Sequence, residues 1–286
     1  MGWHTRSRLK ALTDHAVVPV GRSQWPRLRE LARSADAVIH IAGINRAPDH
    51  DLENGNLQLA RDLADAIRHS ESLRTIVYAN STQSLNDSPY GRGKAKAADL
   101  LRDTAHSVGA SFLDVILPNL FGEHGRSDYN SFVATFVHRV ISEQSPTVQD
   151  KPITLLHAQD AAQALIDGLT ASFGAEQLAP TSTATTVGEV LRTLKYQFGQ
   201  YRSGDIPALA SNLEVRLFNT LRAAMFQTYP PVPLHRHVDS RGSLVETVRA
   251  HGSEGQTFFS STRPGVTRGQ DENPELGMAE QACHCS

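Results

Sequence analysis

Short apolar segments alternate with amphipathic helical segments through the first 170 residues, and this alternation limits the possible folds more than any other feature. Continuously apolar strands separated by helices are typical of a parallel sheet that is covered on both faces. The sequence therefore predicts an α/β fold with a doubly wound parallel sheet. The expected strands are 16–20, 37–43, 75–79, 111–117 and 153–157, and the expected helices are 2–13, 27–34, 56–67, 90–107, 131–142 and 160–169.

The alternation weakens after residue 170, and the composition changes near residue 230. Helices expected near 186–200 and 211–226 would form a cap over the ligand-binding edge of the sheet. Beyond them, Gly- and Ser-punctuated segments at 243–248 and 256–262 are typical of strands and turns. The sequence thus predicts a first domain over 1–229 with a core at 1–170 and a cap at 171–229, a β-rich segment over 230–269, and a disordered tail over 270–286.

The charge balance and the two cysteines exclude several classes of protein. The 28 Lys and Arg residues nearly cancel the 30 Asp and Glu residues, so no basic surface for nucleic acid is expected. No apolar run reaches the roughly 20 residues needed to span a bilayer, which argues against a membrane partner. Cys283 and Cys285 lie in the polar tail, so neither a disulfide framework nor a metal site is expected there, and a reducing cytoplasm fits.

Tyr90 and Lys94 stand four residues apart at the start of a predicted helix, which places both on one helical face. Ser81 lies nine residues before Tyr90, just beyond a predicted strand, with Thr82 as the alternative. Ligands of open α/β sheets bind outside the carboxyl ends of the strands, where these residues fall. The alternative to a catalytic role is that Tyr90 and Lys94 are a solvated surface pair.

These residue types suit the reduction of a carbonyl group. A hydride that arrives at a carbonyl carbon leaves an alkoxide, which needs a proton from a positioned acid. The phenol of Tyr90 has an ordinary pKa of about 10, and a nearby ammonium would lower it. We expect Lys94 to supply that ammonium and to hold the nicotinamide ribose, and Ser81 to hydrogen-bond the carbonyl oxygen.

Four segments resemble motifs of the extended short-chain dehydrogenase/reductase family, which includes sugar-nucleotide epimerases, dehydratases and reductases. They are ADAVIHIAG (35–43), SPYGRGKAKAADLL (88–101), LPNLFG (117–122) and ITLLHAQDAAQALI (153–166). The resemblance implies a Rossmann-like fold. It places Ala42 and Gly43 under the dinucleotide and Pro118 and Asn119 at the nicotinamide and substrate pocket. It also makes Asn56 a structural residue, Asp160 the acid of the last motif, and Gly93 the small residue before the lysine.

Two later segments, YNSFVATFVHRV (129–140) and VPLHRHVDSRGSLVETVR (232–249), are similar to bifunctional capsular-polysaccharide enzymes of the UDP-N-acetyl-L-fucosamine pathway, in which a reductase is joined to a cupin. This implies a UDP-sugar partner, a UDP-linked 2-acetamido-2,6-dideoxy-4-ketohexose that is reduced at C4 with NADPH. It also implies zinc, but only in an intact cupin, and it allows a homodimer.

Two other functions stay open. One is a sugar-nucleotide epimerase or dehydratase, although Thr82 and Gln83 after Ser81 lack the acidic residues of a dehydratase. The other is a non-catalytic dinucleotide-sensing or scaffold protein.

Arg22 and Ser23 favour NADP(H) over NAD(H). They follow the expected strand 16–20, and an arginine there can pair with the 2′-phosphate of NADP, whereas NAD-binding proteins place an acidic residue on the ribose. The alternative is a solvated loop arginine.

Both ends of the chain depart from the family pattern. Gly2 matches the third glycine of the dinucleotide fingerprint, so the first strand and glycine-rich loop are expected to be missing and NADPH binding to be weak. After Gly269 the chain lacks the His-x-His pair that would supply cupin metal ligands. His235 and His237 precede the matched segment and are expected to be solvated. We therefore expect a truncated cupin-like segment with no metal.

Overall fold

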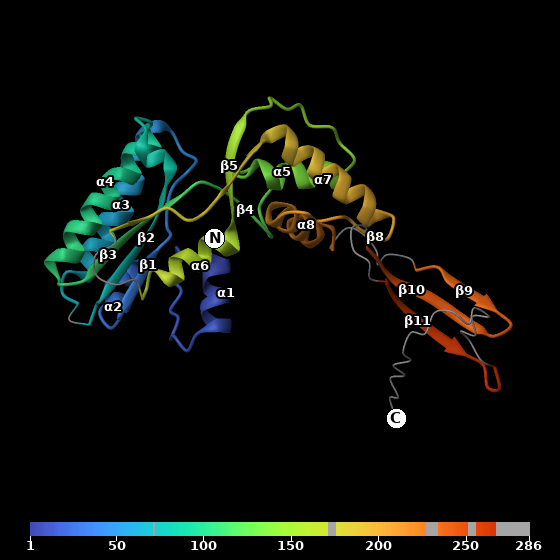
Figure 1. The fold of residues 1–286 in the computed structure, drawn as a ribbon. Coiled ribbons are helices and arrows are strands. Elements are labelled where there is room, and N and C mark those ends of the chain that lie inside the picture. The colour runs from blue at the N-terminus through green and yellow to red at the C-terminus, as the bar shows by residue number, and fades with distance from the viewer. Residues whose placement is uncertain (71, 171–175, 227–233, 251–255, 267–286) are drawn as a thin grey trace. The chain divides into compact units, whose positions relative to one another are not determined.

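The computed structural model describes residues 1–70, 72–170, 176–226, 234–250 and 256–266 (Figure 1). The chain divides into two compact units. The first contains Met1–Phe198 and Ala210–Tyr229, and the second contains Gly199–Leu209 and Pro230–Ser286. The second unit thus includes 199–209, which the sequence analysis grouped with the helical cap, because the short strand β8 (Asp205–Ile206) pairs with β10 (Gly242–Ala250).

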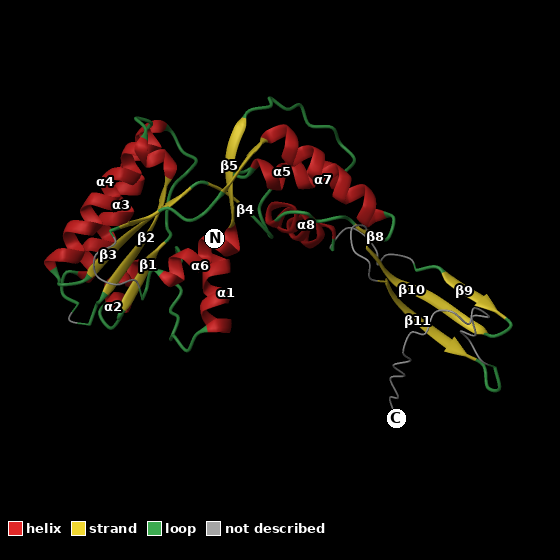
Figure 2. Cartoon of the chain, in the orientation of Figure 1, coloured by secondary structure: helices red, strands yellow, loops and turns green. Residues whose placement is uncertain are grey.

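A four-stranded parallel sheet forms the centre of the first unit (Figure 2). Its strands are β1 (Ala37–His40), β2 (Thr75–Ser81), β3 (Ser111–Leu117) and β6 (Gln177–Leu178), in the order β1-β2-β3-β6. All neighbouring pairs are parallel. The predicted α/β fold with a parallel sheet is confirmed.

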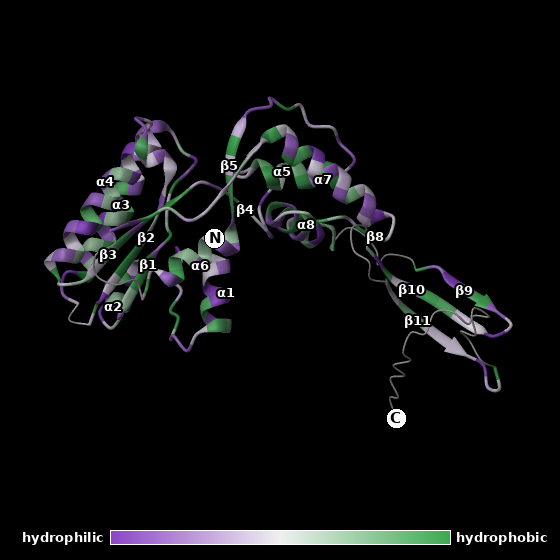
Figure 3. Cartoon of the chain, viewed as in Figure 1, coloured by the Kyte–Doolittle hydropathy of each residue, from purple (hydrophilic) through white to green (hydrophobic). Residues whose placement is uncertain are grey.

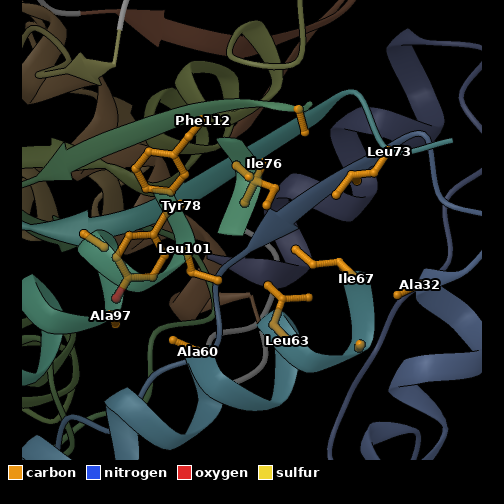
Figure 4. Packing of buried hydrophobic residues seen from close by; sticks show 14 of the residues in the cluster. Ala32, Ala60, Leu63, Ile67, Leu73, Ile76, Tyr78, Ala97, Leu101 and Phe112 are labelled. Carbon is orange, nitrogen blue, oxygen red and sulfur yellow. The ribbon is translucent and has the colours of Figure 1, made fainter. Parts of the chain in front are cut away.

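Helices cover both faces of this sheet. One face packs against α2 (Leu28–Ala32), α3 (Asp49–Ile67) and α4 (Pro89–Ser107) in a cluster that includes Leu63, Ile76 and Leu101 (Figure 4). The other packs against α6 (Ala158–Asp167), which contacts α1 (Gly2–Leu12). Each buried Leu or Ile contributes roughly 1.5–3 kcal/mol to folding. Figure 3 shows the bands of hydrophobic and hydrophilic residues along α3 and α4 that this packing requires.

The prediction of a strand at 16–20 is wrong. These residues form neither helix nor strand, although Val20 packs against the α2–α4 cluster. An apolar run becomes a strand only when its N–H and C=O groups find a ladder partner, and among the described strands β1 pairs with β2 alone. The predicted strand 37–43 is also shorter and ends at His40. Conversely, α3 begins seven residues before the predicted start, at Asp49, where Asp49 and Asp51 favour a helix N-terminus.

The remaining elements of the first unit lie beyond β3. A second sheet has the order β4-β5-β7. The helices that accompany it match the predicted ones closely, and α5 packs against α8. An ion pair between Asp160 and Arg216 joins α6 to α8. The elements are β4 (Asn119–Phe121), α5 (Phe132–Ile141), β5 (Pro152–His157), β7 (Thr183–Thr186), α7 (Val187–Arg202) and α8 (Asn212–Met225).

In the second unit, β10 pairs with β11 (Gln256–Thr262), β9 (Arg236–Asp239) and β8. The turn before β10 needs a glycine, because Gly242 has a φ of 152° and a Cβ there would lie 1.9 Å from the Ser261 carbonyl oxygen. His235 and His237 are exposed, and the described residues contain no metal-binding group of three or more ligands. The tail 270–286, with Cys283 and Cys285, lies outside the described residues.

Candidate active site

The carboxyl ends of three parallel strands bring the predicted site residues to one edge of the sheet. Ser81 pairs with Leu117 across β2 and β3, so Thr82 and Pro118 leave the sheet side by side. His40 pairs with Tyr78 across β1 and β2, and Ala42 and Gly43 follow two and three residues later. This edge is where an open α/β sheet binds its ligand.

Ser81 and Tyr90 meet at the start of α4. The Ser88 hydroxyl caps this helix by accepting a hydrogen bond from Gly91 N at 3.0 Å, which fixes Tyr90 in the first turn. Ser81 accepts a hydrogen bond from Gln83 N at 3.2 Å, where the turn η2 (Thr82–Leu85) begins, and its side chain hydrogen-bonds Tyr90. Thr82 is exposed. The structure therefore joins Ser81 to Tyr90.

Lys94 is buried, with 3% of its surface exposed. Its Nζ donates a hydrogen bond to the Ala79 carbonyl oxygen at 2.7 Å and lies 4.1 Å from the centre of the Tyr78 ring. Desolvation lowers the pKa of Lys94 to about 7, and the Asp114 carboxylate offsets only part of that effect.

The pKa of Tyr90 shifts in the direction opposite to the one expected from the sequence. Burial raises this pKa, and the hydrogen bond from Ser81 lowers it only in part. The expected lowering required the Lys94 ammonium to act on the phenol, and here that ammonium is directed at Ala79 and the Tyr78 ring.

Two glycines let α4 approach its neighbours closely enough to bury Lys94. A Cβ at Gly93 would lie 2.8 Å from the Glu53 carbonyl oxygen and 2.9 Å from its Cα. A Cβ at Gly91 would lie 2.2 Å from the Gln83 carbonyl oxygen. Glu53 then forms ion pairs with Arg92 and Lys96 on α4, which lower the pKa of its carboxyl group.

Asn56 fixes the loop that follows β1. Its Oδ1 accepts a hydrogen bond from Ile44 N at 3.0 Å, and its Nδ2 donates to the Ile44 and Leu52 carbonyl oxygens, both at 2.7 Å. A Cβ at Gly43 would lie 3.2 Å from Asn56 Oδ1, so a small residue is favoured there. Asn56 is therefore a structural residue.

The residues at this edge fit the nicotinamide end of a dinucleotide. Gly43 leaves room beside a fixed loop, and Ser81, Tyr90 and Lys94 offer hydroxyl and ammonium groups close to the strand ends. Four other proposed cofactor residues are exposed at the surface. Arg22 and Ser23 are in the exposed turn 21–24, Asn119 is exposed in β4, and Gly2 begins α1, where a Cβ would meet nothing within 4 Å. Their roles stay predictions.

Several buried polar side chains lie behind the trio of Ser81, Tyr90 and Lys94, and they were not predicted from the sequence. The His40 ring stacks on Tyr78 with 5.6 Å between centroids, and Asn80 Nδ2 donates to Asp114 Oδ2 at 3.0 Å. Burial, with a smaller effect of Lys94, lowers the pKa of His40 to about 3, so this histidine is neutral. Polar residues inside otherwise apolar strands, as in AVIH and SFLDV, were the available signal.

Comparison with known families shows the protein family of this chain. Residues 3–176 match the model of the NAD dependent epimerase/dehydratase family. The chain belongs to this family. Membership implies a nicotinamide dinucleotide cofactor and agrees with the parallel sheet and the strand-edge position of Tyr90. None of the described helices is long and apolar enough to cross a bilayer.

The chain is also similar to individual proteins. A UDP-2-acetamido-2,6-beta-L-arabino-hexul-4-ose reductase of Pseudomonas aeruginosa is 32% identical over 261 residues, which cover 88% of this chain and 69% of the relative. The crystal structure of the capsular polysaccharide assembling protein CapF from Staphylococcus aureus is 29% identical with a TM-score of 0.75, and the match covers 94% of this chain and 74% of CapF. WbmF of Bordetella bronchiseptica, solved with NAD+ and UDP, is 14% identical with a TM-score of 0.60 over 77% and 82% of the two chains, and shares the fold alone.

Proposed function

We propose that this chain reduces the C4 carbonyl of a UDP-linked 2-acetamido-2,6-dideoxy-4-ketohexose, in the synthesis of capsular or other cell-surface polysaccharide precursors. The observation that carries the proposal is the hydrogen-bonded Ser81–Tyr90 pair, one helical turn from Lys94 at the ligand-binding edge of the sheet. The reductase from P. aeruginosa, 32% identical over 88% of this chain, and the similarity to CapF support the substrate class.

The residues at this edge divide the chemistry between them. A dinucleotide held at this edge would supply the hydride that C4 of the sugar receives. The Ser81 hydroxyl donates a hydrogen bond to the C4 carbonyl oxygen and orients it. The Tyr90 hydroxyl donates its proton to that oxygen, so the carbonyl becomes an alcohol and Tyr90 becomes a phenolate. The raised pKa of Tyr90 keeps it protonated before the reaction. Lys94 would hold the ribose hydroxyls beside this phenol once its Nζ turns from the Ala79 carbonyl oxygen toward the cofactor.

NADP(H) is the cofactor that we propose. Arg22 is exposed in the turn 21–24, where its guanidinium is free to reach the 2′-phosphate, and no acidic residue occupies 21–24 to bind a ribose diol.

Replacement of Tyr90 by Phe tests the proposed reaction. We expect turnover of the UDP-4-ketohexose to fall by roughly 10²-fold or more, because the proton donor is lost, while NADPH binding is retained. Oxidation of NADPH and of NADH, followed at 340 nm in parallel, measures both the rate and the cofactor preference. Tyr196→Phe, at a 48% exposed residue of α7, is the matched control and should leave the rate unchanged.

Two results would contradict this assignment. Undiminished turnover in Tyr90→Phe would remove Tyr90 from the role of acid. NADPH binding without turnover by the unmodified chain would favour the non-catalytic dinucleotide-sensing function.

A further inference from the structure

Two guanidinium groups lie close to the ring of Tyr129. The Cζ atom of Arg46 is 5.1 Å from the centre of this ring, and that of Arg126 is 5.5 Å from it. Arg46 comes from the loop after β1, whereas Arg126 and Tyr129 come from the loop 122–131 after β4. All three side chains are exposed. Two loops that are distant in the sequence thus place two guanidinium groups next to one aromatic ring.

The position of this arginine–tyrosine–arginine cluster is fixed from both sides. Arg46 Nη1 donates to the Asp128 carbonyl oxygen at 3.1 Å, and the Tyr129 hydroxyl donates to Asn45 Oδ1 at 3.5 Å. The first loop is held at Ile44 by Asn56. In the second loop, Asp128 has a φ of 53°, a strained value for a residue with a side chain. Such strain is retained where the surroundings enforce it, and it clusters at ligand-binding sites.

The two arginines keep their charge available for a ligand. Among the described residues, neither guanidinium makes an ion pair with a carboxylate. The nearby Asp128 carboxylate is occupied by Arg139, at 3.2 Å. Within the described part of the chain, one N–H group of Arg46 donates a hydrogen bond, and its acceptor is a neutral carbonyl oxygen. The remaining N–H groups form the planar fork that binds phosphate oxygens in pairs.

The cluster lies at the same edge of the sheet as the proposed catalytic trio. Arg46 follows Gly43 by three residues beyond β1, and the loop 122–131 follows Asn119 and β4 beyond β3. β1 and β3 flank β2 in the parallel sheet, so the chain leaves both strands next to the end of β2, where Ser81 lies. The contact of Arg46 with the Tyr129 ring then brings the loop after β4 beside the loop after β1.

We propose that Arg46 and Arg126 bind the diphosphate of the nucleotide-sugar substrate, with both guanidinium groups positioned against the Tyr129 ring. This inference rests on the proposed function, since that function supplies the UDP-sugar. A diphosphate could also come from the dinucleotide cofactor. We assign the substrate's diphosphate because Ala42 and Gly43, at the start of this loop, are the residues expected to line the dinucleotide.

Binding of UDP, UMP and NADP+ to the full chain, measured by calorimetry, tests the cluster. UMP lacks the second phosphate and serves as the reference ligand. We expect Arg46→Met and Arg126→Met each to raise the Kd for UDP by roughly 10-fold or more, to change the Kd for UMP by less, and to leave NADP+ binding unchanged. Arg61→Met, at an exposed arginine of α3, is the control and should change none of the three.

The possible results separate this inference from the proposed function. If the unmodified chain binds UDP and both variants bind it equally well, the cluster is not the diphosphate site and the proposed function stands. If the variants lose NADP+ affinity but not UDP affinity, the diphosphate that they bind is the cofactor's. If UMP binding weakens as much as UDP binding, the second phosphate is not recognised. If the unmodified chain does not bind UDP, both the inference and the proposed substrate class fail.

Discussion

Burying the Lys94 ammonium group costs free energy, and few polar groups surround it to offset that cost. Its side chain is 3% exposed, and its polar contacts are the Ala79 carbonyl oxygen and the face of the Tyr78 ring. A pKa of about 7, against 10.5 for a free lysine, corresponds to roughly 5 kcal/mol of unfavourable free energy for the charged form. A leucine or methionine at this position would make a more stable protein, so a chemical role is the reason to have lysine there.

Replacement of Lys94 by Met is therefore expected to stabilise the fold at pH 6 by about 1–3 kcal/mol, since the buried charge is removed while one hydrogen bond and one cation–π contact are lost. The difference in the free energy of unfolding between the variant and the unmodified protein changes sign as the pH rises. Above pH 7 the folded chain releases the Lys94 proton while the unfolded chain keeps it up to about pH 10.5. Between pH 7 and about pH 10.5, the free energy of unfolding of the unmodified protein therefore rises by about 1.4 kcal/mol per pH unit relative to that of the variant.

Urea unfolding at pH 6, 7, 8 and 9 measures this difference. Lys195→Met, at an exposed lysine of α7, is the control and should give a difference that does not vary with pH. A Lys94→Met variant that is less stable than the unmodified chain at pH 6 would contradict the burial of the ammonium.

At the scale of elements, the close approach of α3 and α4 decides where the proposed active-site residues lie. Gly93 makes this approach possible, because a Cβ there would press on the Glu53 backbone at 2.8 and 2.9 Å. We expect Gly93→Ala to destabilise the fold by about 1–3 kcal/mol as α4 moves away, and to reduce turnover because Tyr90 and Lys94 move with the helix.

Gly199→Ala is the matched comparison, since Gly199 lies in α7 and a Cβ there would meet nothing within 4 Å. That change should stabilise the protein by about 0.5–1 kcal/mol, the ordinary preference of a helix for alanine. Thermal unfolding of both variants gives the comparison, and equal effects would show that the helix contact at Gly93 is not tight.

Most of the elements follow from the sequence because their signals are local. β2 and β3 are mainly apolar segments, and α4 has a capping residue at Ser88 and apolar residues at helical spacing. The segment 16–20 has the same apolar character but no ladder partner, which only the assembled sheet could show. β6 and β8 are two residues long and exist only through the strands beside them.

In the candidate site, too, some features have a local signal in the sequence and others depend on long-range packing. The four-residue spacing along one helix predicted that Tyr90 and Lys94 share a face. The apolar strand before Ser81 predicted that Ser81 lies at the carboxyl end of that strand. The Arg46–Tyr129 contact joins residues 83 positions apart, and the direction of the Lys94 side chain depends on Ala79 and Tyr78. Long-range packing of this kind leaves no local pattern in a sequence.

At the scale of the whole molecule, the two units bury their apolar residues to different extents. In the first, Ile76, Val77 and Val115 are fully buried in the central sheet. In the second, Phe258 and Phe259 are 60% and 64% exposed, although neighbouring residues of a strand point to opposite faces. Neither face of the β9–β10–β11 sheet is therefore covered at these positions by the described residues. The stability of such a unit depends on ladder hydrogen bonds more than on a core.

Hydrogen exchange followed by mass spectrometry should show this difference in one experiment. We expect amides of β10 and β11 to exchange at least roughly 100-fold faster than those of β2 and β3, because a sheet with uncovered faces opens locally while the central strands exchange only on global unfolding. A dilution series supplies the control. Equal protection at every concentration would contradict the exposure of Phe258 and Phe259 in solution. Protection of β10 and β11 that is lost on dilution would instead show that a second copy of the chain covers this sheet.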